Sequence, residues 1–189
     1  RDSVASRGLG DVYKRQIPYG IGFIKNKYIG RTFILPTQAQ REAAVNIKLN
    51  VLRDSVRGKR VVMVDDSIVR GTQLRETVEF LYENGAKEVH IRSACPPILY
   101  GCKYLNFSRS TSDMDLLARA TIMELEGEEG FKYIEEYSDA STERGQALLS
   151  NICKKLHLSS LGYQSLKGLI EAIGLPEDCV CTYCWTGKE

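Results

Sequence analysis

The hydrophobic and polar positions of the chain follow a strand, helix, strand pattern between residues 60 and 94. Residues 61–64 are apolar with no polar alternation, which predicts a strand buried on both faces of a parallel sheet. Residues 88–94 alternate as a second strand. Between the strands we expect a helix that ends at Gly85 and has apolar residues at helical spacing: Leu74, Val78 and Leu81. The pattern therefore predicts a βαβ unit and an α/β fold.

Most of the remaining chain has helical spacing. Thr37 and Gln40 form a capping-box pattern that opens a helix running toward Val51. The second half predicts, in order, a helix over 112–125, a solvated acidic break over 126–129, a helix over 140–157, a short strand over 161–166, and a helix over 167–173 that is closed by Gly174 and Pro176.

An acidic pair, Asp65 and Asp66, directly follows the first apolar strand. Open α/β sheets bind their ligands at the carboxyl ends of strands. The next residues turn at Gly71 and enter a helix, so the amides of residues 67–72 converge near a helix N-terminus, where an anion can sit. Receiver domains and nucleotide hydrolases also carry two acids after a strand. The Gly-Thr entry into the helix argues against a merely solvated strand end, and the combination indicates a site for a phosphorylated sugar and its metal.

This segment resembles the phosphoribosylpyrophosphate (PRPP) signature of type I phosphoribosyltransferases. Within that group, it most resembles the motif of the glutamine PRPP amidotransferases, which catalyse the first step of purine synthesis. The motif in this chain is Val-Val-Met-Val-Asp-Asp-Ser-Ile-Val-Arg-Gly-Thr, residues 61–72. The resemblance implies an α/β fold with a type I phosphoribosyltransferase-like parallel sheet flanked by helices. It also implies that the sheet is incomplete at its N-terminal side and that a helical C-terminal extension follows.

The resemblance assigns roles to the acidic pair and to the loop after it. Asp65 and Asp66 would hold the ribose hydroxyls and lie close to a Mg²⁺ ion. Gln73 stands where many relatives have a second Thr, and Val69 stands where salvage relatives have an acid that serves a nucleobase. Ammonia is therefore the better-fitting acceptor. The residues implied to wrap the 5′-phosphate are Ser67, Ile68, Val69, Arg70, Gly71 and Thr72.

A second segment, residues 24–34, resembles the mobile loop that closes over PRPP in this family. Its cations could neutralise a pyrophosphate leaving group and exclude water. Lys27 stands where Arg is common, so a forked donor is replaced by a point charge. Without the acidic pair downstream, the segment would be read as an exposed basic turn. The residues implied to have catalytic roles are Lys25, Lys27, Tyr28 and Arg31.

The cysteines form a third group of candidate residues. A Cys-x-x-Cys turn together with a distant third Cys makes a soft-metal or iron–sulfur site plausible. By resemblance to the cluster-bearing branch of the amidotransferases, Cys102, Cys181 and Cys184 would ligate a [4Fe-4S] cluster. Zinc is the main rival metal, and disulfides are disfavoured. The fourth ligand of the family lies upstream of this resemblance, and substitution by Cys95 or Cys179 stays open.

Length and composition fit one globular unit. With 189 residues, 43% of them hydrophobic, the chain can bury a core, and no window is long and apolar enough to span a membrane. A net charge of +2 argues against a nucleic-acid surface, which needs a concentrated basic face. Cys153 is interpreted as a plain buried thiol, and His90 and His157 as neither ligands nor bases.

Residues 1–16 share nothing with the family and are interpreted as a non-native leader. We expect a partial phosphoribosyltransferase core over 17–105 and a helical region with the Cys-x-x-Cys turn over 106–189. The resemblance then covers residues 17–189, the later part of a full amidotransferase. The glutaminase domain would be absent, and the chain alone would be inactive with glutamine. The family is cytosolic and homo-oligomeric, and the implied partners are PRPP and that glutaminase domain.

The resulting hypothesis is a fragment of an amidophosphoribosyltransferase, which makes 5-phosphoribosylamine and pyrophosphate from PRPP and glutamine-derived ammonia. One alternative is a PRPP-binding regulator that keeps the fold without turnover. Such proteins usually add a basic DNA- or RNA-binding surface, which the sequence does not reveal. The other alternative is a salvage phosphoribosyltransferase, against which Val69 and the cysteine layout weigh.

Overall fold

The computed structural model describes residues 17–25, 49–104 and 113–188. By its contacts the chain divides into two compact units. Unit 1 holds residues 1–59 and 83–87, and unit 2 holds residues 60–82 and 88–189. Each unit is described by itself.

Unit 1 contains a two-stranded antiparallel sheet. Strand β1 (Phe23–Lys25) pairs with β2 (Leu49–Val51), and helix α3 (Arg53–Val56) follows. The helix predicted to run from Thr37 lies mostly outside the described residues. Its expected end at Val51 is wrong, because residues 49–51 form a strand whose main-chain groups pair with β1.

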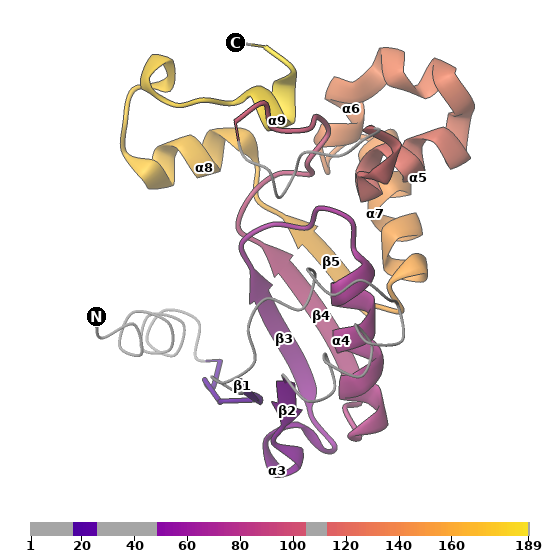
Figure 1. Ribbon diagram of the computed structural model, residues 1–189, viewed down its shortest axis with the longest axis vertical. Helices are drawn as coiled ribbons and strands as arrows, with labels where there is room; N and C mark the ends of the chain where they lie inside the picture. The colour runs from indigo at the N-terminus through magenta and orange to yellow at the C-terminus, as the bar shows by residue number, and fades with distance from the viewer. Residues whose placement is uncertain (1–16, 26–48, 105–112, 189) are drawn as a thin grey trace. The chain divides into compact units, whose positions relative to one another are not determined.

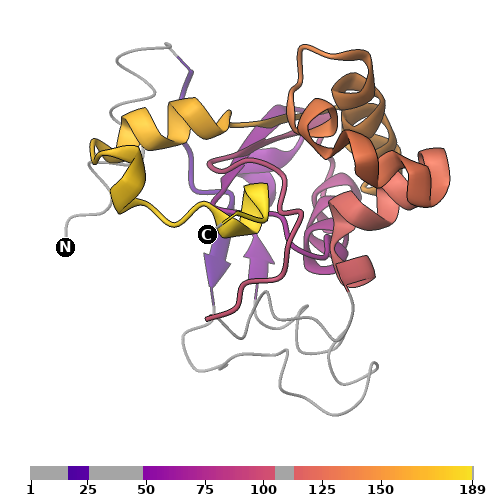
Figure 2. The ribbon, with the colours of Figure 1, turned by 90° about the horizontal axis from the view of Figure 1, so that it is seen from above.

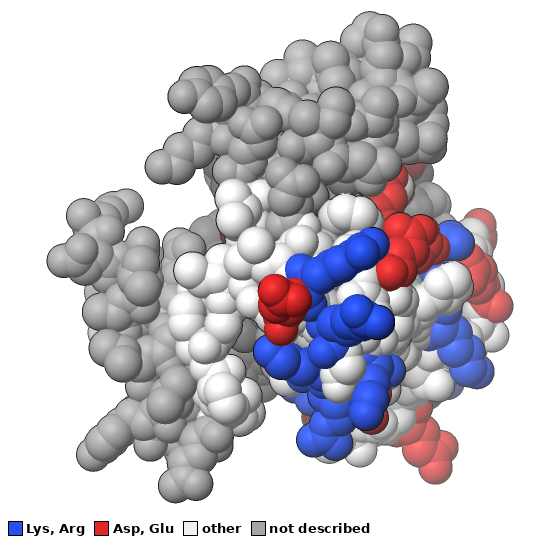
Figure 3. Space-filling view, turned by 90° about the horizontal axis from the view of Figure 1, so that it is seen from below, with Lys and Arg blue, Asp and Glu red and all other residues white. Residues whose placement is uncertain are grey.

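Exposed basic side chains gather around α3 in unit 1 (Figure 3). The Lys87 N–H donates to the Lys59 carbonyl over 2.8 Å, and the Gly58 N–H donates to the Gly85 carbonyl over 2.7 Å. These bonds bring residues 83–87 next to the end of α3. The basic residues are Arg53, Arg57, Lys59 and Lys87, and the acids Asp54 and Glu83 belong to the same unit.

Unit 2 is built on a three-stranded parallel sheet in the order β3-β4-β5 (Figure 1). Its strands are β3 (Arg60–Asp65), β4 (Glu88–Ser93) and β5 (Ser160–Tyr163). The parallel sheet flanked by helices confirms the predicted fold class. Since β5 comes from the C-terminal half of the chain, the sheet takes strands from both sides of the domain boundary expected near residue 105.

Helix α4 (Thr72–Glu83) connects β3 to β4 and confirms the predicted βαβ unit. Its buried residues are the expected ones: Leu74, Val78 and Leu81. The Tyr82 hydroxyl accepts a hydrogen bond from the Val89 N–H at 3.3 Å and lies 3.2 Å from the Ser159 hydroxyl oxygen. These contacts hold the end of α4 against β4 and the start of β5. Val89 and Ile91 of β4 are both 0% exposed and belong to the core of this unit.

The expectation that residues 61–64 are buried on both faces is wrong. Val62 is 47% and Val64 is 71% exposed, whereas Val61 and Met63 are half-buried. Strand β3 lies at the edge of the three strands, and the strand register places Val64 beside the exposed Arg92. An unbroken apolar run indicates a strand but does not tell which of its faces is covered.

Helices follow β4 and surround β5. Helix α5 begins at Leu117, and not at residue 112, because a 3₁₀ turn and an extended Leu116 precede it. The expected acidic break is a 3₁₀ segment followed by a short helix that the sequence pattern did not reveal. The elements are η3 (Asp113–Asp115), α5 (Leu117–Glu126), η4 (Gly127–Tyr133), α6 (Ile134–Ser138), α7 (Glu143–Lys155), α8 (Leu166–Ile173), η5 (Glu177–Cys179) and α9 (Tyr183–Thr186).

Side-chain caps begin the two longer C-terminal helices, and a glycine ends the second of them. The Thr142 side chain accepts the Gly145 N–H at the start of α7, and the Ser165 side chain accepts the Gly168 N–H at the start of α8. Gly174 closes α8 in a left-handed conformation, as expected. Among the described residues, no helix has the length and apolar character needed to cross a membrane.

Candidate functional site

The acidic pair lies at the carboxyl end of β3, where the sequence predicts it. We call residues 65–72 the acid loop. The Asp66 N–H donates to Asp65 Oδ1 at 3.0 Å, and the Ser67 hydroxyl donates to Asp66 Oδ1 at 3.2 Å. Asp65 is half-buried and Asp66 is exposed. Both carboxylates are therefore tied to the start of the bend and available as acceptors there.

Burial controls the charge of Asp65. Loss of solvent raises the pKa of its carboxyl above the ordinary value, the hydrogen bond from the Asp66 N–H opposes this, and the negative charge of Asp66 adds to it. A nearby cation would favour the ionised form. Asp65 is thus suited to a site that is filled by sugar hydroxyls and a metal ion.

The rest of the acid loop is an ordered bend and is not absorbed into α4. The Val69 carbonyl accepts the Leu117 N–H at 2.8 Å, and Ile68 is 4% exposed. Gly71 has a φ of +76°, and a Cβ there would lie 2.8 Å from Leu117 Cδ2. The left-handed backbone and the close approach both require glycine. The first turn of α4 contains no acid, which leaves its positive end available to an anion.

The predicted catalytic residues fall largely outside this description. Lys25 is the last residue of β1 in unit 1. Lys27, Tyr28 and Arg31 lie outside the described residues. Their proposed action on a pyrophosphate therefore stays a prediction.

The structure brings Cys102, Cys181 and Cys184 together. We call residues 181–187 the cysteine turn. The Cys184 carbonyl accepts the N–H groups of Leu99 and Tyr100 at 2.9 and 3.0 Å, which ties the turn to the loop after β4 (Figure 2). The Cys184 thiol is hydrogen bonded to Cys102 and is affected by the charge of Cys181. Burial, followed by these two thiols, raises the pKa of Cys184 to about 11.

Aromatic contacts support the cysteine turn. The Tyr100 and Tyr183 rings lie 6.0 Å apart, and Lys103 Nζ lies 4.5 Å from the Tyr183 ring centroid. Gly187 has a φ of +71°, and a Cβ there would lie 2.7 Å from Tyr100 Cζ. The turn therefore closes only because glycine allows the Tyr100 ring to approach.

The sulfur donors suit a thiophilic metal centre in chemistry, since soft ligands select iron–sulfur clusters and zinc. Within residues 17–25, 49–104 and 113–188, no three His, Cys, Asp or Glu side chains are arranged to hold a metal ion. The three thiols are thus neighbours without ligand geometry. The Cys95 thiol donates to the Pro96 carbonyl at 3.3 Å, and Cys179 is exposed in η5.

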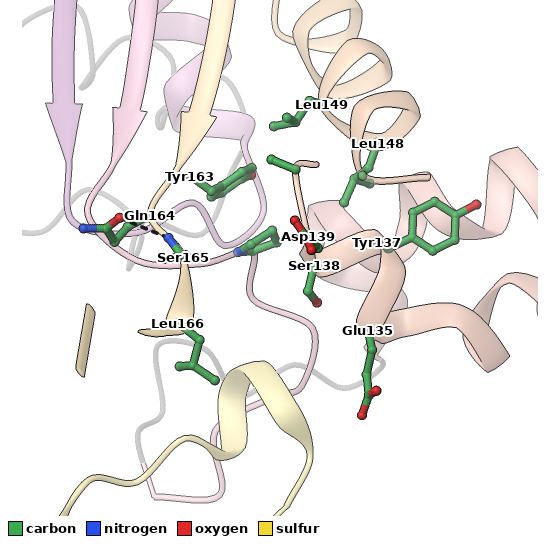
Figure 4. Close-up of a pocket in the computed structure, with 13 residues that line it drawn as sticks. Glu135, Tyr137, Ser138, Asp139, Leu148, Leu149, Tyr163, Gln164, Ser165 and Leu166 are labelled. Carbon is green, nitrogen blue, oxygen red and sulfur yellow. Dashed lines mark hydrogen bonds between the residues drawn. The ribbon is translucent and has the colours of Figure 1, made fainter. Parts of the chain in front are cut away.

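A cavity of about 310 Å³, which the sequence did not reveal, lies at the carboxyl end of β5 (Figure 4). Tyr163 lies on one side of it, and Leu148 and Leu149 lie on the other. Neither acid of the acid loop lines it. The lining residues are Pro97, Glu135, Tyr137, Ser138, Asp139, Ala140, Gly145, Leu148, Leu149, Tyr163, Gln164, Ser165 and Leu166.

No family model matches the chain, but its similar proteins share one description. The amidophosphoribosyltransferase of Methanothermobacter thermautotrophicus is 39% identical over 186 residues, which cover 98% of this chain and 33% of the relative. That of Methanocaldococcus jannaschii is 40% identical over 187 residues, which cover 99% of this chain and 33% of the relative. That of Bacillus subtilis is 39% identical over 191 residues, which cover 99% and 34%. The chain thus spans about a third of the length of these relatives.

Two solved structures share the fold. The glutamine PRPP amidotransferase of B. subtilis, complexed with ADP and GMP, has a TM-score of 0.68 and 38% identity, and the match covers 99% of this chain and 36% of that one. A structure described as the allosteric regulatory enzyme of purine biosynthesis has a TM-score of 0.68 and 37% identity, covering 95% and 34%. The sequence matches include most of residues 1–16; the interpretation of those residues as a leader lies outside the described structure and stays a prediction.

Proposed function

We propose, from the premise that this chain belongs with the amidophosphoribosyltransferases over about a third of their length, that its acid loop binds PRPP. The proposed reaction transfers the ribose 5-phosphate group of PRPP to glutamine-derived ammonia. It gives 5-phosphoribosylamine and pyrophosphate, and glutamate is left by the hydrolysis of glutamine that supplies the ammonia. From the resemblance alone, we also propose that a glutaminase domain and homo-oligomer formation complete the active protein.

The observation that carries this proposal is the geometry of the acid loop. The carboxylates of Asp65 and Asp66 are anchored at the bend, and α4 begins directly after it with no acid in its first turn. Ribose hydroxyls would donate to these carboxylates, and the 5′-phosphate would accept N–H groups of residues 67–72. Fixing the ribose in this way supports displacement at the anomeric carbon mainly by positioning and electrostatics.

The leaving group needs positive charge, which the proposal assigns to a metal ion and to the basic segment. Mg²⁺ held near Asp65 and Asp66 would neutralise charge on the departing pyrophosphate. Lys25, Lys27, Tyr28 and Arg31 would close over the same group. Ammonia attacks as the free amine, so the proposal needs no general base from the acid loop.

Isothermal titration calorimetry with Mg²⁺ and PRPP tests the binding step. We expect the wild-type chain to bind and the Asp65→Asn/Asp66→Asn variant to lose about 100-fold or more in affinity, because two charge-assisted acceptors are removed. Glu128→Gln/Glu129→Gln is the matched control, since it removes two adjacent exposed acids with the same charge change. An unchanged affinity in the Asp65/Asp66 variant would remove the pair from the site. An assay of PRPP with added ammonia then tests the transfer itself.

A salvage transferase fits the structure less well. Val69, at the position where salvage relatives have an acid, packs against the apolar cluster of Cys95, Ile98 and Leu116. It offers no polar contact to a nucleobase. Titration with free purine and pyrimidine bases in the presence of PRPP is expected to give no ternary complex.

The regulator alternative is favoured by one observation, the exposed basic residues around α3 (Figure 3). Asp54 and Glu83 in the same unit reduce the charge of that surface. We therefore expect no salt-sensitive binding of duplex DNA in a fluorescence anisotropy titration. Binding that is lost in an Arg53→Ala/Arg57→Ala variant would support the regulator instead.

We also propose that Cys102, Cys181 and Cys184 hold a [4Fe-4S] cluster, with zinc as the alternative metal. The hydrogen bond between Cys102 and Cys184 and the proximity of Cys181 support this assignment. Anaerobic reconstitution with iron and sulfide should give the visible absorption of a cluster in the wild-type chain and in Cys153→Ser, whose thiol lies on α7. Cys102→Ser and Cys184→Ser should lose it. Equal absorption in all four proteins would refute the assignment.

A further inference from the structure

The acid loop and the cysteine turn contact the same small group of apolar side chains. We call this group the junction cluster. Its three buried members come from the segment after β4 and from the residue before α5. Four half-buried residues pack against them: one from the acid loop, one from α8 and two from the cysteine turn. In that order, the members are Cys95, Ile98 and Leu116, followed by Val69, Leu169, Cys184 and Trp185.

Val69 attaches the acid loop to this cluster in two ways. Its side chain packs against the buried cluster members, and its carbonyl accepts the N–H of Leu117 at 2.8 Å. The Leu117 side chain in turn lies against Gly71. The position of the residues around Leu116 therefore sets the backbone of the bend between Ser67 and Thr72.

Trp185 attaches the cysteine turn to the same cluster. It is the only tryptophan in the chain. Its indole Nε1 is buried, and the ring packs against the cluster that contains the Cys95 side chain, whose pKa it helps to lower. Cys184, the neighbouring residue, packs on the cluster through its side chain and binds the loop after β4 through its carbonyl.

We propose that Trp185 is a positioning residue for the acid loop: the cysteine turn supports Val69 through the junction cluster and so sets the affinity of the loop for a sugar phosphate. This inference rests on the proposed function of the loop. It assigns the cysteine turn a role besides holding a metal. A change in the turn that displaces Trp185 removes the support beneath Val69, because close-packed side chains shift together.

Linkage makes the proposal reciprocal. If the packing of Trp185 strengthens PRPP binding, bound PRPP must in turn stabilise the packed position of Trp185. Mg²⁺ with PRPP is the probe. We expect PRPP binding to shift the emission of Trp185, although the indole is not placed in the acid loop.

The decisive variants are Trp185→Leu, which removes most of the ring but keeps an apolar side chain, and Trp185→Phe, which keeps an aromatic ring. Trp185→Leu should weaken PRPP binding by about 5-fold or more, and Trp185→Phe should restore most of the affinity. Ile152→Val, a core change on α7, controls for loss of stability without loss of support. Hydrogen exchange at the Leu117 amide, which donates to Val69, reports the loop without any ligand.

The outcomes separate this inference from the proposed function. If the wild type binds PRPP, and Trp185→Leu binds equally with unchanged Leu117 exchange, the inference is overturned and the function stands. If the wild type does not bind PRPP, the proposed function fails. The exchange rate then decides the inference alone: faster Leu117 exchange in Trp185→Leu but not in Ile152→Val supports it, and equal rates overturn it.

Discussion

The acid loop and the cysteine turn differ in what holds them. The acid loop runs from a six-residue strand directly into the twelve-residue helix α4, whose apolar face is buried. The cysteine turn contains only the four-residue helix α9 and is held by two hydrogen bonds to the Cys184 carbonyl, by aromatic contacts and by the junction cluster. So short a helix is not stable by itself. The acid loop is therefore preformed by the core, whereas the cysteine turn is assembled from distant segments.

Because of this difference, we expect the two sites to differ in the free energy needed to open them locally. Regions with few buried contacts open locally at a lower free energy than the core. Opening the acid loop requires breaking β3 or α4, whereas the cysteine turn can open by losing its contacts to the loop after β4. A bound metal would join the distant segments, and its binding energy would then stabilise the turn.

The largest effect is expected from Gly71→Ala in the acid loop. The new Cβ would adopt a left-handed φ of +76° and lie 2.8 Å from Leu117 Cδ2 and 3.2 Å from Leu156 Cδ2. Backbone strain and overpacking together should lower the free energy of unfolding by roughly 2–4 kcal/mol. Urea denaturation followed by circular dichroism measures this loss.

Gly174→Ala is the matched control for Gly71→Ala. Gly174 has a φ of +73°, and a Cβ there meets no atom within 4 Å. It should show the backbone strain alone, about 1 kcal/mol. Equal losses in the two variants would mean that α5 and α7 do not restrain the acid loop, and the contrast with the cysteine turn would disappear.

A smaller and more local effect is expected from Gly187→Ala. Its Cβ would lie 2.7 Å from Tyr100 Cζ, so the cysteine turn must move away from the Tyr100 ring. We expect faster hydrogen exchange at the Leu99 and Tyr100 amides, which donate to the Cys184 carbonyl, with a change of no more than about 1 kcal/mol in global unfolding.

The Tyr100→Ala background removes the steric part of this effect. There, Gly187→Ala should change amide exchange only through backbone strain, and the difference between the two backgrounds measures the contact. A global loss as large as that of Gly71→Ala would show that the cysteine turn unfolds with the core. The two regions would then form one cooperative unit.

The same contrast explains what the sequence could predict. The acid loop is contiguous: a strand, a bend and a helix follow one another, and the spacing of Leu74, Val78 and Leu81 identifies the helix. The exposed face of β3 could not be inferred, because the exposure of Val64 depends on the position of the strand at the sheet edge. The pairing of β5 with β4 joins residues 70 positions apart, which no local pattern reports.

The cysteine turn illustrates the limit of local patterns more sharply. Periodicity says nothing about Cys102 lying near Cys184, and only the family resemblance grouped them. The sequence pattern predicts too early a start for α5, because the polar residues before Leu116 resemble caps, whereas the structure has a 3₁₀ turn there. It does not reveal the cavity beside β5, because the loop and helix segments that line the cavity are separate in the sequence.

The smallest expected effect concerns the charge of Asp65. Because burial raises the pKa of this carboxyl in the folded chain, the group favours folding when it is protonated, and that contribution is lost as the pH rises through the raised pKa. Asp65→Asn keeps an acceptor for the Asp66 N–H and removes the charge. It should therefore unfold at slightly higher urea near neutral pH, by less than about 1 kcal/mol, because solvent screens a half-exposed group.

The size of this effect depends on pH, and its sign depends on the ligand and its metal. At about pH 3, where the wild-type carboxyl is largely protonated in both states, the advantage of Asp65→Asn should vanish. Adding Mg²⁺ with PRPP near neutral pH should reverse the order, since the ligand stabilises only a chain that binds it. Glu128→Gln should follow the wild type under all three conditions. If Asp65→Asn is less stable than the wild type without ligand, the carboxylate is stabilised by the fold itself, and the acid loop is structural in the way proposed here for the cysteine turn.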